Sequence, residues 1–362
     1  MKIFYIDPNN TTPQYNYPLV EKLNEEGVQT VFFTSKNEKF VNYYEKIYSI
    51  APNYWFFKFE NKIKIKKLRK FVKMFLYPIQ NIRLFLKIKK EKPQIIHYNW
   101  LAFPFIDFFM INKISRLGIK IILSVHDYKQ HDRQKLRVLE KKVFDRVDGI
   151  ICLSEFVKSQ FPKKLQTKII VIQHGNCYEK ELKNLKITTK KSDNFSLLMI
   201  GNIKPYKGAE ILIDAVNSLS KSNIKLEICG RCNYQQKLVE RAKNPNIYFD
   251  FGFVEHNKLY RKIAHCDVEV LPYLRATQSG LPYIFAHFKK PLIVTNSGGL
   301  SEQVSTDFAE IVEPNAESIA KAILKIQKRK IKPSSFDEFL EQNSWQNTVK
   351  KYINLYRKMA DE

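Results

Sequence analysis

YLRATQSGLPYIFAHFKKPLIVTNSGGLSE, residues 273–302, is the stretch that decides the fold. It contains the polar turn 277–280, and the helical pattern that follows this turn is expected to begin at Leu281. A buried strand at 291–295 then leads into a second tight turn, 296–299. Two such turns at neighbouring strand ends form the crevice in which an open parallel sheet binds nucleotides. Taken alone, the two turns fit an ordinary strand–helix–strand unit equally well.

The start of the expected helix is suited to a phosphate. The backbone N–H groups of Ser279, Gly280 and Leu281 lie at or just before its first residue, where they have no partner inside the helix. The positive end of the helix dipole lies at the same place. We therefore expect these three N–H groups to hold a phosphate of the ligand.

The chain is strongly basic. Its 362 residues include 61 Lys and Arg against 36 Asp and Glu, a formal net charge of +25, and 44% are hydrophobic, enough for two domain cores. Such a charge favours anionic partners. No recognised nucleic-acid-binding module is present, so we expect no nucleic-acid partner. No apolar run reaches the ~18 residues of a spanning helix, and residues 1–10 resemble a first strand rather than a signal peptide. We expect a cytoplasmic protein.

Residues 58–92 hold much of this charge. They contain thirteen Lys or Arg against two Glu, and apolar side chains recur at helical spacing between Leu68 and Leu76. Such a helix can lie on an anionic membrane, where each basic group adds about 1 kcal/mol. It can also be an outer helix of a domain, with its apolar stripe in the core and its lysines in water. The two interpretations are compatible, and we expect a peripheral protein on the inner face of the cell membrane.

Strands and helices alternate through the first half of the chain, and the same alternation starts again in the second half. This predicts two doubly wound α/β domains. The first is expected over 1–183 and the second over 184–340, with a polar linker inside 178–194. Residues 333–341 are interpreted as a second connection, and 344–359 as an amphipathic helix. Polar residues end most strands of the first domain, at the edge where ligands bind in such sheets; these residues are Asp7, His97, His126, Ser154 and His174.

Five segments of the second half carry a family resemblance. They are, in order, 201–208 (GNIKPYKG), 252–254 (GFV), 266–272 (CDVEVLP), 276–280 (ATQSG) and 298–302 (GGLSE). The series resembles the donor domain of a family 4 (group 1) glycosyltransferase, in a subgroup with an ATQSG turn in place of the E-x7-E pair. The first half is similar more loosely, through His126 and Asp127. The resemblance implies the GT-B fold, in which two Rossmann-like domains face each other across a cleft and the C-terminal helix, here 344–362, completes the first domain. It also implies a nucleotide sugar such as a UDP- or GDP-sugar as the donor, and no metal or other cofactor.

The chemistry of the donor supports lysine side chains as ligands. A departing nucleoside diphosphate must have its negative charge stabilised, and without a D-x-D metal site cations and N–H groups must provide this. Lys204 and Lys207 follow a strand and precede a helix, so both can reach a phosphate. Arg231, at the next strand end, can add charge to the same pocket.

The remaining site residues follow from the resemblance. It implies that Val254 meets the nucleobase, that Glu302 belongs to the donor site and that His126 faces the donor sugar as the catalytic candidate. Asn202 stands where the family has an arginine, and Lys204 substitutes for it. The 276–285 segment has no carboxylate, and residues 277–279 stand at the first Glu position and 284–285 at the second. The sugar contact then falls to Gln278, beside Thr277, and the ribose contact stays unassigned.

These residues predict a hexosyltransferase that extends a glycan acceptor, expected to be lipid-linked, in cell-surface polysaccharide synthesis. The family implies retention of the anomeric configuration. Asp127 either fixes the tautomer of His126 or caps the next segment. Two alternatives stay open. One is a nucleotide-sugar epimerase on the same fold, and the other is a catalytically degenerate partner subunit that binds a glycan.

Overall fold

The computed structural model describes residues 1–361 apart from 37, 58–62, 64, 129–137, 184, 186, 188–193 and 221, and it does not describe the side chains of 38–42, 66 and 138. Its contacts divide the chain into two compact units. Unit 1 is Met1–Cys177 with Asn343–Glu362, and unit 2 is Tyr178–Gln342. The basic residues Lys58, Lys62 and Lys64 of the predicted membrane segment lie outside the described residues.

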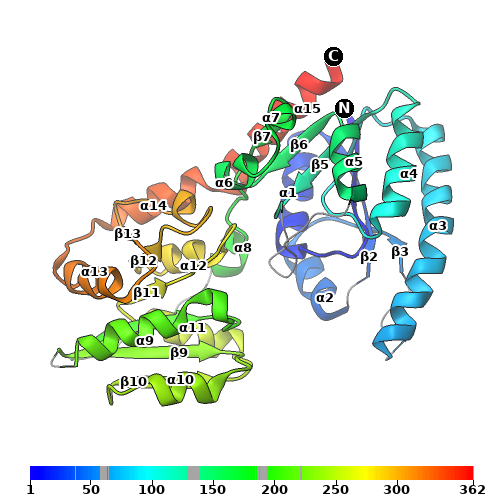
Figure 1. The fold of residues 1–362 in the computed structure, drawn as a ribbon. Helices are drawn as coiled ribbons and strands as arrows, with labels where there is room; N and C mark the ends of the chain where they lie inside the picture. Colours follow the sequence, from blue (N-terminus) through cyan, green and yellow to red (C-terminus); the bar gives the residue numbers. More distant parts are fainter. Residues whose placement is uncertain are drawn as a thin grey trace. The chain divides into compact units, whose positions relative to one another are not determined.

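Unit 1 is built on a parallel sheet. In the part of the unit that is described, the sheet has seven strands in the order β3 (Asn53–Phe56), β2 (Gln29–Ser35), β1 (Lys2–Asp7), β4 (Ile95–Tyr98), β5 (Lys120–Val125), β6 (Gly149–Cys152) and β7 (Ile169–Val171). Its helices are α1 (Pro13–Glu25), α2 (Glu38–Ile47), α3 (Lys66–Glu91), α4 (Pro104–Ser115), α5 (Val138–Arg146), α6 (Glu155–Ser159), α7 (Lys163–Gln166) and α15 (Trp345–Asp361). Figure 1 shows α15 running beside α1. The strand order reverses between β1 and β4, the switch point of a doubly wound sheet.

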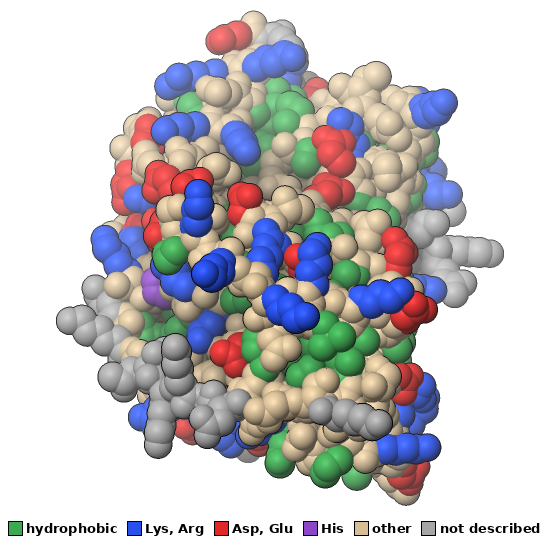
Figure 2. Space-filling view, turned by 90° about the vertical axis from the view of Figure 1, so that its left-hand side faces the viewer, with side chains coloured by type: hydrophobic (Ala, Val, Ile, Leu, Met, Phe, Trp, Pro, Cys, Tyr) green, Lys and Arg blue, Asp and Glu red, His purple; other side chains and the backbone are tan. Residues whose placement is uncertain are grey.

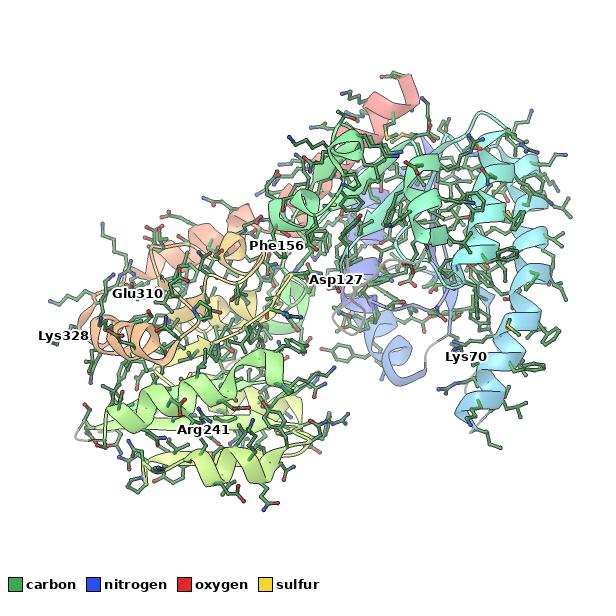
Figure 3. The ribbon with its side chains drawn as sticks, viewed as in Figure 1. Lys70, Asp127, Phe156, Arg241, Glu310 and Lys328 are labelled. Carbon is green, nitrogen blue, oxygen red and sulfur yellow. The ribbon has the colours of Figure 1, made fainter. Side chains whose placement is uncertain are left out.

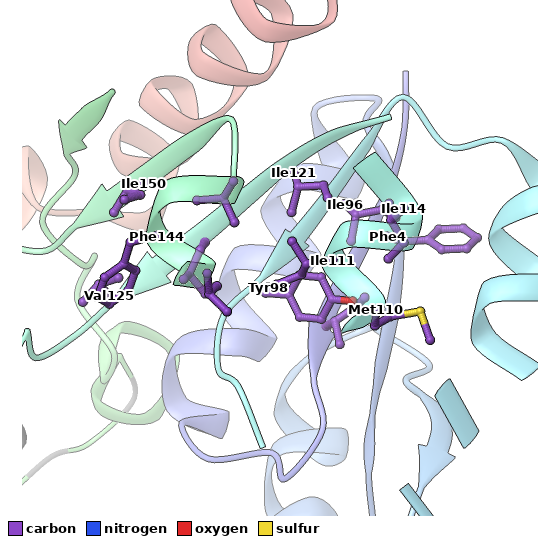
Figure 4. Packing of buried hydrophobic residues seen from close by; sticks show 14 of the residues in the cluster. Phe4, Ile96, Tyr98, Met110, Ile111, Ile114, Ile121, Val125, Phe144 and Ile150 are labelled. Carbon is purple, nitrogen blue, oxygen red and sulfur yellow. The ribbon is translucent and has the colours of Figure 1, made fainter. Parts of the chain in front are cut away.

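One core of unit 1 lies between the sheet and the helices that include α3 and α4. Strand residues such as Phe4, Ile96 and Ile121 pack there against Ile111 and Ile114 of α4 (Figure 4). These strands are apolar at nearly every position because a parallel sheet covered by helices is buried on both faces.

Unit 2 repeats the plan. Its sheet, counted over the described residues, has six parallel strands in the order β10 (Ile247–Phe251), β9 (Ile224–Gly230), β8 (Phe195–Ile200), β11 (Val268–Leu271), β12 (Leu292–Thr295) and β13 (Ala309–Val312). The helical segments are α8 (Glu179–Leu182), η2 (Pro205–Lys207), α9 (Ala209–Ser218), α10 (Gln235–Arg241), α11 (His256–His265), α12 (Leu281–His287), η3 (Ser301–Gln303), α13 (Ala316–Lys328) and α14 (Pro333–Gln342). The strand order reverses between β8 and β11. Two doubly wound sheets confirm the predicted α/β fold class.

Two segments interpreted as connections differ in the structure. Residues 333–341 form most of the helix α14, which packs on α12 and buries Phe336 and Phe339 in the core of unit 2. The expected linker 178–194 contains the short helix α8, whose Leu182 is fully buried in the same core. Both are polar in sequence, so their few apolar residues give a weak periodic signal.

Lys and Arg side chains are spread over the surface. On the face drawn in Figure 2 they gather across the middle, with a hydrophobic patch below them. Among the described helices, none is both long enough and apolar enough to cross a bilayer.

Candidate functional site

The predicted donor residues of unit 2 lie in loops at one edge of its sheet. Because β8 to β12 are parallel, their carboxyl ends share this edge. Asn202, Lys204 and Lys207 follow β8, Arg231 follows β9, Val254 follows β10, residues 277–281 follow β11, and Glu302 follows β12. The switch point between β8 and β11 therefore has the lysines on one side and the ATQSG turn on the other.

Close packing at Gly208 holds the loops after β8 and β11 together. The Leu274 N–H donates to the Tyr206 carbonyl at 2.8 Å. Gly208 lies beside this bond in the left-handed conformation, with φ of 71°. A Cβ atom there would overlap the Pro272 carbonyl oxygen and lie 2.9 Å from its carbon. Only glycine fits, so the turn that presents Lys207 is fixed against the loop after β11.

A second close approach joins the loops after β8 and β9. The Ile203 N–H donates to the Arg231 carbonyl at 2.7 Å. Gly230 has φ of 134°, and a Cβ there would overlap the Gly201 carbonyl oxygen. The loop that carries Lys204 is thereby held next to Arg231. The Arg231 guanidinium lies 5.1 Å from the ring centre of Phe253, a side chain that is 70% exposed.

Lys207 is the better-defined cation of this edge. Its Nζ lies 3.6 Å from the ring centre of Tyr273, in a cation–π contact. Burial lowers its pKa to about 8, an effect that Glu269 opposes and Lys204 reinforces. Lys207 therefore carries its charge at neutral pH. Lys204 has its Nζ 5.9 Å from the ring centre of Tyr206.

Two of the three N–H groups predicted to hold a phosphate at the ATQSG turn are already hydrogen-bonded within the protein. The Ser279 N–H donates to Gln303 Oε1 at 2.7 Å, and the Leu281 N–H donates to Ser279 Oγ at 3.3 Å. Thr277 and Ser279 are buried, while Gln278 is partly exposed. A phosphate at this turn would meet the Gly280 N–H first, and would reach the other two by displacing these bonds.

Glu269 and Tyr273 were not predicted from the sequence. Glu269 stands in the middle of β11 and is fully buried, and Tyr273 lies beneath Lys207. A carboxylate inside the otherwise apolar run 268–271 was the available signal. Tyr273 gave none, because a buried tyrosine after a strand is an ordinary core residue.

His126, at the end of β5 in unit 1, is held by Asn99. The Asn99 Nδ2 donates to Asn16 Oδ1 at 2.7 Å and to Thr12 Oγ1 at 3.1 Å. This orientation turns the Asn99 Oδ1 toward His126 Nε2, 3.0 Å away. Since Oδ1 can only accept, Nε2 carries the ring proton and Nδ1 carries a lone pair. Trp100 stacks on the imidazole, with ring centres 4.5 Å apart.

Burial makes His126 a neutral group. It lowers the pKa of the ring to about 3, with a further contribution from His174. A neutral imidazole with its proton on Nε2 can accept a hydrogen bond from a sugar hydroxyl through Nδ1. Asn99, rather than Asp127, fixes this tautomer. Asp127, labelled in Figure 3, keeps one buried carboxylate oxygen without a hydrogen-bond partner among the described residues.

The other histidines at strand ends of unit 1 have structural surroundings. His97 is fully buried between the Tyr356 hydroxyl, 2.6 Å from Nδ1, and Ser124 Oγ, 2.8 Å from Nε2. His174 Nδ1 lies 3.0 Å from the Gly175 carbonyl oxygen and donates to it. Within the described parts of the chain, no cluster of three or more His, Cys, Asp or Glu side chains could hold a metal ion.

Two family models match the chain, one in each unit. "Glycosyltransferase Family 4" matches residues 14–176, and "Glycosyl transferases group 1" matches residues 180–342. Together the two matches support a glycosyltransferase of the group 1 type. In this family assignment, His126 falls in the first model, and Lys204, Lys207 and the ATQSG turn fall in the second.

Individual glycosyltransferases resemble the chain along most of its length or part of it. An uncharacterised glycosyltransferase of Methanocaldococcus jannaschii is 28% identical, over 76% of this chain and 78% of the relative. A GDP-mannose:glycolipid 4-beta-D-mannosyltransferase of Xanthomonas campestris pv. campestris is 31% identical over 51% of this chain, which covers 52% of that relative.

Solved structures share the fold. A glycosyltransferase from Rickettsia africae ESF-5 superposes with a TM-score of 0.72 at 17% identity, over 99% of this chain and 98% of its own. Anabaena HepE in complex with UDP and glucose has a TM-score of 0.68 at 14% identity, over 99% of this chain and all of its own. These likenesses, with the two parallel sheets, confirm the predicted GT-B fold.

Proposed function

We propose that the chain transfers a hexose from a nucleotide sugar to a lipid-linked glycan acceptor, with retention and without a metal, in cell-surface polysaccharide synthesis. One observation carries the proposal. Lys204 and Lys207 lie beside the switch point of unit 2, on a loop that glycine packing fixes in place. Support for the substrates comes from relatives. The HepE structure was solved in complex with UDP and glucose, and the name of the Xanthomonas relative contains GDP-mannose and a glycolipid.

In this proposal the residues divide the work by their chemistry. The two lysines and the Gly280 N–H neutralise the departing diphosphate, and Arg231 adds a third cation. Val254 contacts the nucleobase, and Gln278 contacts the donor sugar. Glu302 belongs to the same donor site. Asn202 and Thr277 line the same edge. The neutral His126 of unit 1 accepts a hydrogen bond from the donor sugar and, because Nδ1 has no proton, stabilises no negative charge there.

The donor claim predicts that UDP or GDP raises the melting temperature of the purified protein, because both bind the folded state through the diphosphate. A panel of nucleoside diphosphates in melting assays, run with EDTA, measures this. The matched nucleoside monophosphates serve as controls and should shift it less. The absence of any shift, together with no hydrolysis of UDP- or GDP-sugars, would favour the degenerate-subunit alternative.

A membrane partner is proposed on the solvent-facing side of α3. Phe71 and Phe75 are 55% and 59% exposed, and they belong to a row of exposed apolar side chains, which are Leu68, Phe71, Phe75, Ile79, Ile82 and Leu86. The row follows one helix face over about 27 Å, at 1.5 Å per residue. The opposite face buries Tyr77, Leu84 and Ile88 in the core. A helix with a core face and a separate apolar solvent face has a second surface to bury.

Basic side chains border this apolar row. At about 100° per residue, Lys67 and Lys89 fall on one side of it, and Arg83 and Lys90 on the other. Lys70, also on α3, is labelled in Figure 3. Aromatic side chains between flanking cations fit the boundary of an anionic leaflet. We propose the inner face of the cell membrane as the location of the enzyme.

The double variant Phe71→Ser/Phe75→Ser is expected to bind vesicles at least about tenfold more weakly, because each phenylalanine adds about 1.5–3 kcal/mol when fully buried. Sedimentation with vesicles containing phosphatidylglycerol measures the loss. Val239→Ser, at an exposed apolar position of unit 2, is the control. Equal binding of the wild type to neutral phosphatidylcholine vesicles would contradict the role of the basic border.

A further inference from the structure

Glu269 is a buried carboxyl inside a sheet. It stands on β11 between Val268 and Val270 and has no exposed surface. Neither of its oxygens has a hydrogen-bond partner among the residues that the structure describes. A buried polar group without a partner costs roughly 1–3 kcal/mol of stability. An apolar residue here would pack with its neighbours, so the carboxyl needs another explanation.

The side chain of Glu269 lies on the same face of the sheet as Leu271, because alternate residues of a strand share a face. Val268 and Val270 belong to the core on the other face, together with α9 residues such as Leu212. Leu271 and Tyr273 belong to the core that α12 covers. Glu269 is thereby placed on the Tyr273 side of the sheet.

Lys207 approaches from the loop after β8. Its Nζ lies 3.6 Å from the Tyr273 ring centre, and it is the cation whose charge acts on Glu269. The titratable groups around Lys207 are Lys204 and Tyr206 from its own loop, and Glu269 and Tyr273 from β11 and the residues after it. Glu269 is the acid in this set, and its interaction with Lys207 favours the charged form of each group.

We propose that Glu269 is a positioning residue for Lys207: its buried carboxyl holds the lysine side chain over the Tyr273 ring, with the ammonium directed to the donor diphosphate. The inference rests on the proposed function, since it matters only if Lys207 meets that diphosphate. Burial raises the pKa of Glu269 and lowers that of Lys207, and the attraction between the two opposes both shifts. The acid thus favours the charged form of a half-buried lysine.

The matched variants are Glu269→Gln and Glu269→Leu. Without the acid, burial and Lys204 lower the pKa of Lys207 unopposed. Its charged form is present below that pKa and is lost as the pH rises through it. The affinity for UDP and GDP should therefore fall at a lower pH than in the wild type. Glu269→Leu should also melt at a higher temperature, since it removes the unpartnered polar group.

Calorimetric titration of UDP and GDP between pH 6 and about 9.5 measures the first effect, and melting curves measure the second. Glu227→Gln is the control. Glu227, on β9 of the same sheet, pairs with Lys262 of α11, and its loss should leave the pH profile unchanged. A second readout is the rate at which an acylating reagent modifies Lys207, which should rise in both Glu269 variants because more of the amine is neutral.

Glu269 variants with the wild-type pH profile and Lys207 acylation rate would overturn the inference. Failure of the proposed function gives a different pattern. In that case Lys207→Ala itself binds UDP and GDP as the wild type does, whatever the Glu269 variants do. Loss of binding in Lys207→Ala with neutral Glu269 variants rejects only the positioning role.

Discussion

Lys207→Ala is expected to slow sugar transfer about 30- to 900-fold, equivalent to the 2–4 kcal/mol lost when one charge-stabilising donor is removed from a transition state. The effect should be large because Lys207 is held by the Tyr273 ring and by the Gly208 turn, so its ammonium needs little rearrangement to meet the diphosphate. The loss should appear in kcat, because charge on the leaving group grows as the bond breaks.

Steady-state kinetics with a nucleotide sugar and an acceptor measures this effect. Lys225→Ala is the matched control. Lys225 also places its Nζ over a tyrosine ring, 4.6 Å from the centre of Tyr248, but it lies near the amino end of β9, at the opposite edge of the sheet. Transfer by this variant should equal that of the wild type. A Lys207→Ala enzyme with wild-type kinetics would refute the proposed diphosphate site.

Gly208→Ala is expected to destabilise unit 2 by about 2–5 kcal/mol. A residue with a Cβ at φ of 71° costs roughly 1–2 kcal/mol. The overlap with the Pro272 carbonyl adds about 1–3 kcal/mol, because the loop after β11 must move aside. That movement also shifts Lys207, so UDP and GDP should bind more weakly.

Denaturant unfolding, with and without UDP or GDP, measures both consequences. Gly27→Ala separates backbone strain from overlap. Gly27 has φ of 78°, and nothing lies within 4 Å of an added Cβ. That variant should lose only the strain and should keep nucleotide affinity. Equal losses in the two variants would show that the approach to Pro272 contributes nothing.

Much of the fold follows from local sequence. The helix α12 begins at Leu281 as expected, and the strand expected at 291–295 is found at Leu292–Thr295, since a buried apolar run between turns has few other interpretations. The helix α14 was missed because Pro333 and two serines open it, and only Phe336 and Phe339 are buried. Its helical state depends on packing against α12, which no local pattern encodes.

The site was predictable as a set of loops and not as a set of contacts. The order of strands placed the lysines and the ATQSG turn at one edge. The bond from the Ser279 N–H to Gln303 spans 24 residues of sequence, and that between Asn99 and His126 spans 27. Such pairs depend on the packing of separate loops. For α3, periodicity indicated an apolar face, but only the structure distinguishes its buried Leu84 from its exposed Phe71.

The helix α15 follows unit 2 in the sequence, yet it belongs to unit 1. Its Tyr352 and Tyr356 are buried there, bonded to the hydroxyl of Tyr15 and to His97. During synthesis, the first sheet therefore emerges from the ribosome before Tyr15 and His97 can bond to α15. Another 165 residues, Tyr178–Gln342, must be added before that helix is made. The half of the enzyme made first is the half finished last.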